Sequence, residues 1–292
     1  MSGYEAIFYN ILVFWYLLFI LLIIHLSLFN SLEHKPDFKS YYYDKTPSNK
    51  TAGQLSMLLY RKIVPEVITA TIILLINKRI LKLEETQNDY IISLNSGVNV
   101  NKLGASDKFI ISMFLENMGD NNRISFSAIN KYCESNRNSS EFLLNYQIWL
   151  KIIRKESNVN NYYETKTFYS KIKLYKIIAI VLFAINIISG YYLVSGFLML
   201  IPAYFLQVYF FNIYKRTKEA NEDYHKWMAF KNYLTKFNDF KLNDTQKKDY
   251  LYYGLVLRVD KLDNKVFSNK YSSILNKAIK KCVRRSYKLG IR

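Results

Sequence analysis

The stretch IIAIVLFAINIISGYYLVSGFLMLIPAYFLQVYFFNIY, residues 177–214, contains no Lys, Arg, Asp or Glu, although 22% of the chain is charged. A helix crosses a hydrocarbon core of roughly 30 Å with about 20 residues, so this stretch is close to twice the length of one span. Ser and Gly residues near its middle are typical of a turn. Basic residues flank it at 171–176 and 215–218. A helical hairpin over 176–214 would place both flanks on the cytoplasmic side, as the positive-inside rule asks.

A second apolar segment, residues 6–29, is long enough to form another span. No basic residue precedes it, its apolar part is too long for a signal peptide, and no cleavage pattern follows it. Several Lys residues follow it between positions 35 and 50. The segment therefore predicts an N-terminal transmembrane helix within residues 1–30, with the N-terminus outside and, after three spans, the C-terminus inside.

The soluble parts are predicted to be a cytoplasmic insert, residues 31–175, and a helical C-terminal region, residues 215–292. Within the insert, a helix over 51–60, an apolar helix from Pro65 to Lys78 and a two-stranded hairpin over 80–94 follow one another. Helix, helix and hairpin is the order of a winged helix. The predicted fold class is a mainly α membrane protein with three transmembrane helices and a winged-helix-like α+β insert.

The insert is expected to hold two units, residues 40–98 and 103–170. In the second unit, Ser106 is expected to cap a helix. A short strand is expected at 123–126, helices at 127–135 and 141–155, and a closing strand at 162–168. The last of these helices carries apolar residues at helical spacing.

Two helical patterns mark the C-terminal region. The first is a stripe at three- and four-residue steps, interpreted as packing or as an interaction surface, formed by Tyr224, Trp227, Phe230, Leu234 and Phe237. Residues 250–259 form an apolar helix that would cover it. The second is a basic amphipathic helix, whose apolar stripe is Leu275, Ala278, Ile279, Cys282 and Val283.

The basic residues of that second helix are candidates for contact with lipid headgroups: Lys277, Lys280, Lys281, Arg284, Arg285 and Lys288. Such a helix either lies in the headgroup plane or forms a solvated tail. An anionic inner leaflet attracts each nearby Lys or Arg by about 1 kcal/mol. The expected partners are therefore membrane lipids of the inner leaflet, together with an unidentified protein or a second copy of the chain.

A net charge of +18 also invites a nucleic-acid-binding interpretation,. The candidate reading helix, PEVITATIILLINK at residues 65–78, offers almost no Arg, Lys, Asn or Gln for bases or phosphates. Nucleic acid is therefore disfavoured as a partner, although a membrane-tethered nucleic-acid-binding regulator remains the alternative.

The sequence lacks HExxH, CxxC, GxGxxG, GxSxG and phosphate-binding GxxxxGK[ST] motifs,. The compact acid–base cluster Glu222, Asp223 and His225 is interpreted as a charged outer face. Cys133 and Cys282 are expected to be reduced thiols packed in helices. No catalytic residue, cofactor or metal site is predicted, and the chain is expected not to be an enzyme.

Several segments together resemble a known family: YYYDKTPSNKTAGQLSMLLY, ITATIILLINKRILKLEE, LGASDKFIISMFLENM, EDYHKWMAFKNYLTKFNDF and YLYYGLVLRVDK. They resemble the C-terminal part of the YciQ-like bacterial predicted membrane proteins, a family of unknown function. The resemblance covers roughly residues 36–265, and its most specific part is W-x-x-F-K-x-Y-L at 227–234. It implies an integral protein of the bacterial cell membrane with a cytoplasmic winged-helix-like insert. The N-terminal extracytoplasmic domain usual in the family is expected to be absent.

The expected function is a non-catalytic scaffold or interaction protein at the inner face of the bacterial cell membrane. The expected location is multi-pass, with most of the polar mass in the cytoplasm.

Overall fold

The structure is a computed structural model that describes residues 34–120, 122–157, 162–164, 215–236, 244–259 and 270–290, besides isolated positions from 21 to 184. The chain divides into two compact units. The first comprises Met1–Asp37 and Asn160–Glu222, and the second comprises Phe38–Val159 and Asp223–Arg292. The regions predicted as an insert, 31–175, and as a separate C-terminal region, 215–292, both contribute to the second unit.

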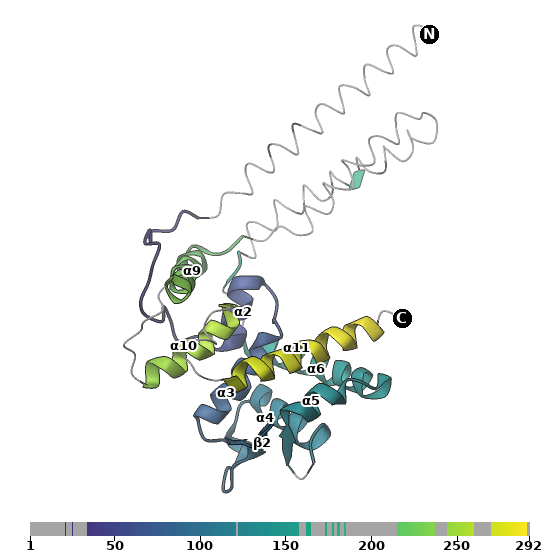
Figure 1. Ribbon diagram of the computed structural model, residues 1–292. Coiled ribbons are helices and arrows are strands. Elements are labelled where there is room, and N and C mark those ends of the chain that lie inside the picture. The colour runs from purple at the N-terminus through teal and green to yellow at the C-terminus, as the bar shows by residue number, and fades with distance from the viewer. Residues whose placement is uncertain are drawn as a thin grey trace, which may run out of the picture. The chain divides into compact units, whose positions relative to one another are not determined.

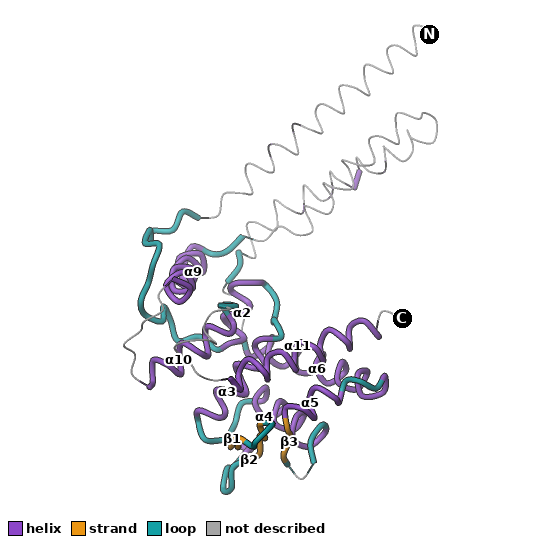
Figure 2. Tube along the Cα trace, in the orientation of Figure 1, coloured by secondary structure: helices purple, strands orange, loops and turns teal. Residues whose placement is uncertain are grey.

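The second unit is mainly helical, with one small sheet (Figures 1 and 2). Its helices before the sheet are α2 (Ala52–Tyr60) and α3 (Glu66–Asn77). Thr51 and Gln54 form a capping box at the start of α2, because each side chain accepts a hydrogen bond from the other residue's backbone N–H, at 3.2 and 3.0 Å,. The capping box fixes where α2 begins.

The predicted hairpin is present as β1 (Leu81–Glu85) and β2 (Tyr90–Leu94), which pair antiparallel. The Thr86 hydroxyl accepts from the Asp89 N–H at 3.0 Å, and the Thr86 N–H donates to the Asp89 carbonyl at 2.8 Å, so the turn is closed from both sides. β3 (Arg123–Ser125) adds to β2 on its other side and gives the order β1-β2-β3. The short strand expected at 123–126 is this third strand.

Between β2 and β3 lie the short 3₁₀ helix η1 (Val100–Lys102), α4 (Ala105–Ile111) and the π-helical segment η2 (Ser112–Asn117). The expected cap at Ser106 is wrong. Gly104 is the N-cap of α4 and makes no side-chain cap bond, whereas the Ser106 N–H donates to a carboxylate oxygen of Glu156 at 3.0 Å. A carboxylate from a distant helix therefore satisfies a free N–H of the first turn.

After β3 come α5 (Phe126–Tyr132) and α6 (Asn136–Glu156), which begin at the caps Ser125 and Ser135. α9 (Lys218–Lys236) continues from the first unit into the second, followed by α10 (Asp244–Val256) and α11 (Lys270–Gly290). Of the closing strand expected at 162–168, only residues 162–164 are described, and there Tyr163 forms an isolated bridge to Arg216.

The core of the second unit is built on α3. Its residues from Glu66 to Ile73 are all buried, because α2, α4, α10, α11 and β1 pack around it. α11 in turn packs on α3, α5 and α6, as Figure 1 shows for the yellow C-terminal helix. The two segments of this unit, far apart in sequence, therefore share one hydrophobic core.

The fold class predicted from the sequence, with three transmembrane helices, is corrected. In the part of the chain that the structure describes, no helix combines the length and the apolar composition needed to cross a bilayer. The apolar α3 has 12 residues and would extend only about 18 Å, while the longer α6 and α11 carry charged residues along an exposed face,. The segments 6–29 and 177–214, on which the spans were predicted, lie almost entirely outside the described residues.

Candidate functional site

The basic amphipathic helix expected near the C-terminus is α11, and its apolar residues are buried. Leu275 and Ile279 are fully buried, as is Cys282, and Ala278 and Val283 are less than a tenth exposed. This stripe faces α3, α5 and α6, on which α11 packs. The apolar side of α11 is therefore used in the core of the second unit, and only its polar side faces outward.

The six basic residues predicted to face lipid fall into two groups. Lys280 contacts the carboxylate of Glu66, with Nζ and Oε1 2.9 Å apart, and Lys281 and Arg285 lie 3.7 and 3.4 Å from Glu134. The remaining three are exposed and, among the described residues, make no ion pair: Lys277, Arg284 and Lys288. Their spacing of seven and four residues puts them on one side of the helix.

We call Lys277, Arg284 and Lys288 the outer basic face of α11. Two large apolar side chains at its borders, Ile274 and Tyr287, are also exposed. Cationic groups flanked by apolar side chains can contact an anionic lipid surface without inserting a helix. The geometry thus leaves this side of α11 open for an anionic surface.

The aromatic stripe predicted on α9 is largely inside the second unit. Trp227, Phe230 and Leu234 are buried, whereas Tyr224 is half-buried and Phe237 lies outside the described residues. Tyr250 and Tyr253 of α10 contact the stripe, with ring centroids 5.1 Å from Phe230 and 4.8 Å from Trp227. The helix expected at 250–259 therefore covers the stripe, which packs as a small aromatic core.

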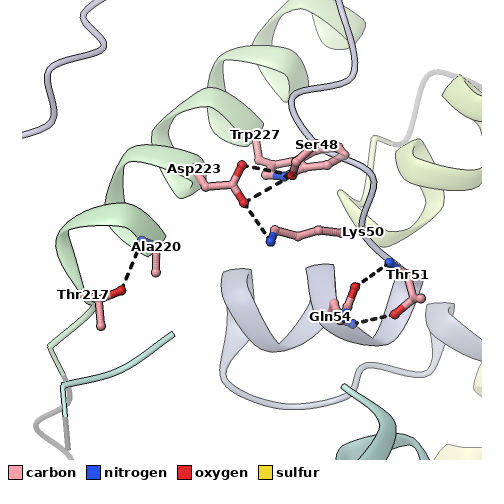
Figure 3. A network of polar contacts seen from close by, with 8 residues as sticks. All are labelled: Ser48, Lys50, Thr51, Gln54, Thr217, Ala220, Asp223 and Trp227. Atoms are coloured by element: carbon pink, nitrogen blue, oxygen red, sulfur yellow. Dashed lines mark hydrogen bonds and ion pairs between the residues drawn. The ribbon is translucent and has the colours of Figure 1, made fainter. Parts of the chain in front are cut away.

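Figure 3 shows a polar network that fixes the segment before α2 to α9. The Ser48 hydroxyl donates to Asp223 at 3.0 Å and accepts from the Trp227 indole N–H at 3.2 Å. The Lys50 ammonium lies 3.0 Å from the same carboxylate, and both side chains are about four-fifths buried. The Asp223 carboxylate therefore contacts both the Ser48 hydroxyl and the Lys50 ammonium. The network is suited to holding the chain in place.

The other members of the predicted acid–base cluster have separate contacts. Glu222, in the first unit, accepts a hydrogen bond from the Asp37 N–H at 2.8 Å. The His225 ring meets Tyr224 edge-on, with centroids 5.5 Å apart. The cluster is thus divided between different contacts. Within the described ranges, no three His, Cys, Asp or Glu side chains gather as metal ligands.

The first unit contains its own polar contact. His34 Nε2 and the Glu164 carboxylate are 2.5 Å apart, and the Lys215 ammonium lies 3.8 Å from the same oxygen. The Asn221 side chain binds the backbone carbonyl of His34. These contacts connect the residues that flank the 165–214 segment to residue 34.

Cys133 and Cys282 are both buried and unbridged. The Cys282 thiol donates to the carbonyl of Ile129 at 3.1 Å. A hydrogen bond with Cys282, together with burial, raises the pKa of Cys133. Cys133 therefore stays protonated and poorly nucleophilic.

Sequence reasoning missed a buried contact between Glu66 and two cations. Its side chain is only 3% exposed and accepts from Arg258 Nε at 2.9 Å, Arg258 Nη2 at 3.3 Å and Lys280 Nζ at 2.9 Å. Burial alone would raise the pKa of Glu66, but its hydrogen bonds with Lys280 and its own backbone N–H and the charges of both cations lower the pKa below its usual value,. The sequence feature that could have indicated this contact is the single carboxylate at the start of an otherwise apolar helix.

The candidate reading helix of the nucleic-acid hypothesis is α3. Because its residues 66–73 and 75 are buried, it has no exposed side that could enter a groove. Only Leu74, Ile76 and Asn77, near its end, are partly exposed.

Comparison with known proteins gives one match. The family described as “Predicted membrane protein (DUF2207) C-terminal domain” matches residues 39–267, which is most of the chain. No curated protein and no solved structure matches the chain.

Proposed function

Because the chain belongs to the family of predicted membrane proteins that share the DUF2207 C-terminal domain, we propose that it is a non-catalytic scaffold at the inner face of a bacterial cell membrane. Within that family we place it with the YciQ-like proteins, on the W-x-x-F-K-x-Y-L run at 227–234. The family description supports a membrane location. The cytoplasmic side and the scaffold role are our proposal.

The observation that carries the proposal is the outer basic face of α11. Its three cations, Lys277, Arg284 and Lys288, point away from the core that the same helix helps to build. Near an anionic leaflet each would contribute about 1 kcal/mol of attraction. A rigid helix with its apolar side already packed would rest on the headgroups, and the rest of the second unit would remain available to a protein partner or a second copy of the chain.

The alternative, a nucleic-acid-binding regulator, gains no specific support. Base readout needs an exposed helix with polar side chains, and α3 is buried along most of its length,. The exposed cations of α11 could contact phosphates of any kind, but nothing in that helix is arranged to read bases.

Energy transfer to labelled lipid tests the proposal on the full chain. A fluorophore is placed at the exposed position 287 through Tyr287→Cys, since both native thiols are buried. In vesicles with a quarter anionic lipid, transfer to headgroup-labelled lipid should exceed that in zwitterionic vesicles. It should also fall on raising the salt from 0.1 to 1 M, which shortens the Debye length from about 10 to about 3 Å.

Charge variants provide the control. The triple variant Lys277→Gln, Arg284→Gln, Lys288→Gln should lose the preference for anionic vesicles. A variant with the same change in net charge, at three other exposed positions, should keep it: Lys78→Gln, Arg79→Gln and Lys102→Gln. Equal energy transfer to anionic vesicles for the two triple variants would refute membrane contact by the outer basic face of α11.

A further inference from the structure

A cavity in the second unit has the donors and the charge of an anion site. It measures about 400 Å³, within the roughly 300–1,000 Å³ range of small-molecule sites,. Four polar side chains line it: Glu66 of α3, Arg258 just after α10, and Asn276 and Lys280 of α11. Two cations against one carboxylate leave a net charge of +1. The cavity therefore favours an anion.

Glu66 orients both cations. Arg258 uses Nε and Nη2 on the carboxylate, and Lys280 uses one of its three ammonium hydrogens,. The second terminal nitrogen of Arg258 and two hydrogens of Lys280 are not used by Glu66. Because the carboxylate is almost fully buried while the two cations are 43% and 46% exposed, their remaining donors are the accessible groups.

Arg258 is held from two further sides. Its guanidinium lies 4.9 Å from the centroid of the Tyr60 ring, and the Tyr60 hydroxyl donates to the Val256 carbonyl at 3.0 Å. The backbone of Arg258 adopts φ 56°, a left-handed conformation that is unfavourable for a residue with a side chain,. The turn is closed by a hydrogen bond from the Val259 N–H to the Gly254 carbonyl at 3.0 Å. The guanidinium is thus pre-positioned.

Asn276 supplies a neutral donor. Its Oδ1 accepts from the Thr69 hydroxyl at 3.1 Å, which leaves the amide nitrogen Nδ2 directed away from Thr69. A guanidinium, an ammonium and an amide from separate elements can donate to one group with several acceptor oxygens. A tetrahedral phosphate fits this set, since it accepts from several directions and pairs strongly with Arg.

We propose that the cavity bounded by Glu66, Arg258, Asn276 and Lys280 binds a phosphate group, with Arg258 and Lys280 as its charged donors and Glu66 as the residue that positions them. The group can come from a lipid headgroup or from free phosphate. The proposal does not depend on the outer basic face of α11, because none of Lys277, Arg284 and Lys288 lines this cavity.

The test titrates the full chain, in neutral detergent, with three probes followed by calorimetry. They are inorganic phosphate, dihexanoyl phosphatidic acid and, as the zwitterionic comparison, dihexanoyl phosphatidylcholine. Saturable binding of one of the first two is expected. If phosphatidic acid binds at least tenfold more tightly than inorganic phosphate, the source is a lipid headgroup; similar affinities identify free phosphate.

Two variants test the site. Arg258→Gln and Lys280→Gln should each weaken binding at least tenfold, whereas Lys102→Gln, at an exposed position outside both α11 and the cavity, should change it less than threefold. If Arg258→Gln fails to fold, the double variant Glu66→Gln, Arg258→Gln removes the cation together with its carboxylate and should also lose binding. No saturable binding by the native chain, or equal affinities in native chain and site variants, would overturn the proposal.

Discussion

Replacing Glu66 by Gln should destabilise the second unit strongly at neutral pH. The substitution keeps the size of the side chain and removes the charge that Arg258 and Lys280 share. Both cations would then face a neutral amide, because an NH₂ group that cannot accept their hydrogen bonds would replace one carboxylate oxygen. The change therefore isolates the ionic part of this contact.

The size of this loss of stability follows from the burial and exposure of the three side chains. Removing one partner of a buried ion pair costs about 3–5 kcal/mol. Here the carboxylate is 3% exposed, but Arg258 and Lys280 are 43% and 46% exposed and water can solvate them again. We therefore expect a loss of about 2–3 kcal/mol in the free energy of unfolding. For a unit of this size this corresponds to a fall in Tm of roughly 4–12 °C.

The effect should also depend on pH. The pKa of Glu66 is lowered below its usual value of 4.5, so its charged form stabilises the folded state. This contribution is fully present above about pH 4.5 and is lost as the pH falls through the lowered pKa. The Tm difference between the native chain and Glu66→Gln should therefore be widest near pH 7 and should narrow in acid.

Thermal unfolding of the full chain, followed by circular dichroism at 222 nm, measures this difference. Glu84→Gln is the matched control, because Glu84 pairs with Lys82 at 2.7 Å on the surface of β1, where both side chains are about half exposed. Exposed pairs contribute little, so this control should unfold like the native chain. Equal unfolding temperatures of the two variants at pH 7 would refute this role of Glu66. A Tm difference between the native chain and Glu66→Gln that stays constant from pH 7 to pH 3 would refute its pH dependence.

Three further substitutions or reactions have defined outcomes. Gly53→Ala would bring a Cβ within 2.8 Å of an α6 side-chain carbon, so an overpacking cost of about 1–3 kcal/mol should outweigh a helix-propensity gain of about 1 kcal/mol,. In Gly104→Ala the nearest atom to the new Cβ is 3.7 Å away, so this control should show no such clash. The Tm of Gly53→Ala should therefore fall below that of Gly104→Ala. Thr51→Ala removes the capping box of α2 and should cost about 1 kcal/mol, whereas Thr51→Ser should retain most of the stability in the same melting experiment,. A thiol reagent should modify neither Cys133 nor Cys282 in the folded chain and both after denaturation, and rapid labelling of the native chain would contradict their burial,.

Local signals in the sequence located several elements of the second unit. The hairpin expected over 80–94 is present, and helical spacing of apolar residues identified α6. Thr51 was correctly placed at the start of α2. These features depend on hydrogen bonds within a few residues, which a sequence pattern encodes directly.

Contacts between distant residues could not be read in the same way. Glu66 meets Arg258, 192 positions later, and nothing near Glu66 in the sequence specifies that partner. The apolar stripe of α11 was expected to lie in the headgroup plane or in a solvated tail, whereas it is buried against α3, α5 and α6. Ser106 was misjudged because Glu156 of α6 supplies the acceptor that a local cap would otherwise provide.

The shared core of the second unit has a consequence for biosynthesis. α3 leaves the ribosome about 200 residues before α11, the helix that covers part of it. At about 5–20 residues per second, its apolar surface waits roughly 10–40 s for its last neighbour. Throughout that interval the apolar surface of α3 is only partly covered, so shielding by a chaperone would favour a good yield, and truncations that end before residue 270 should aggregate,.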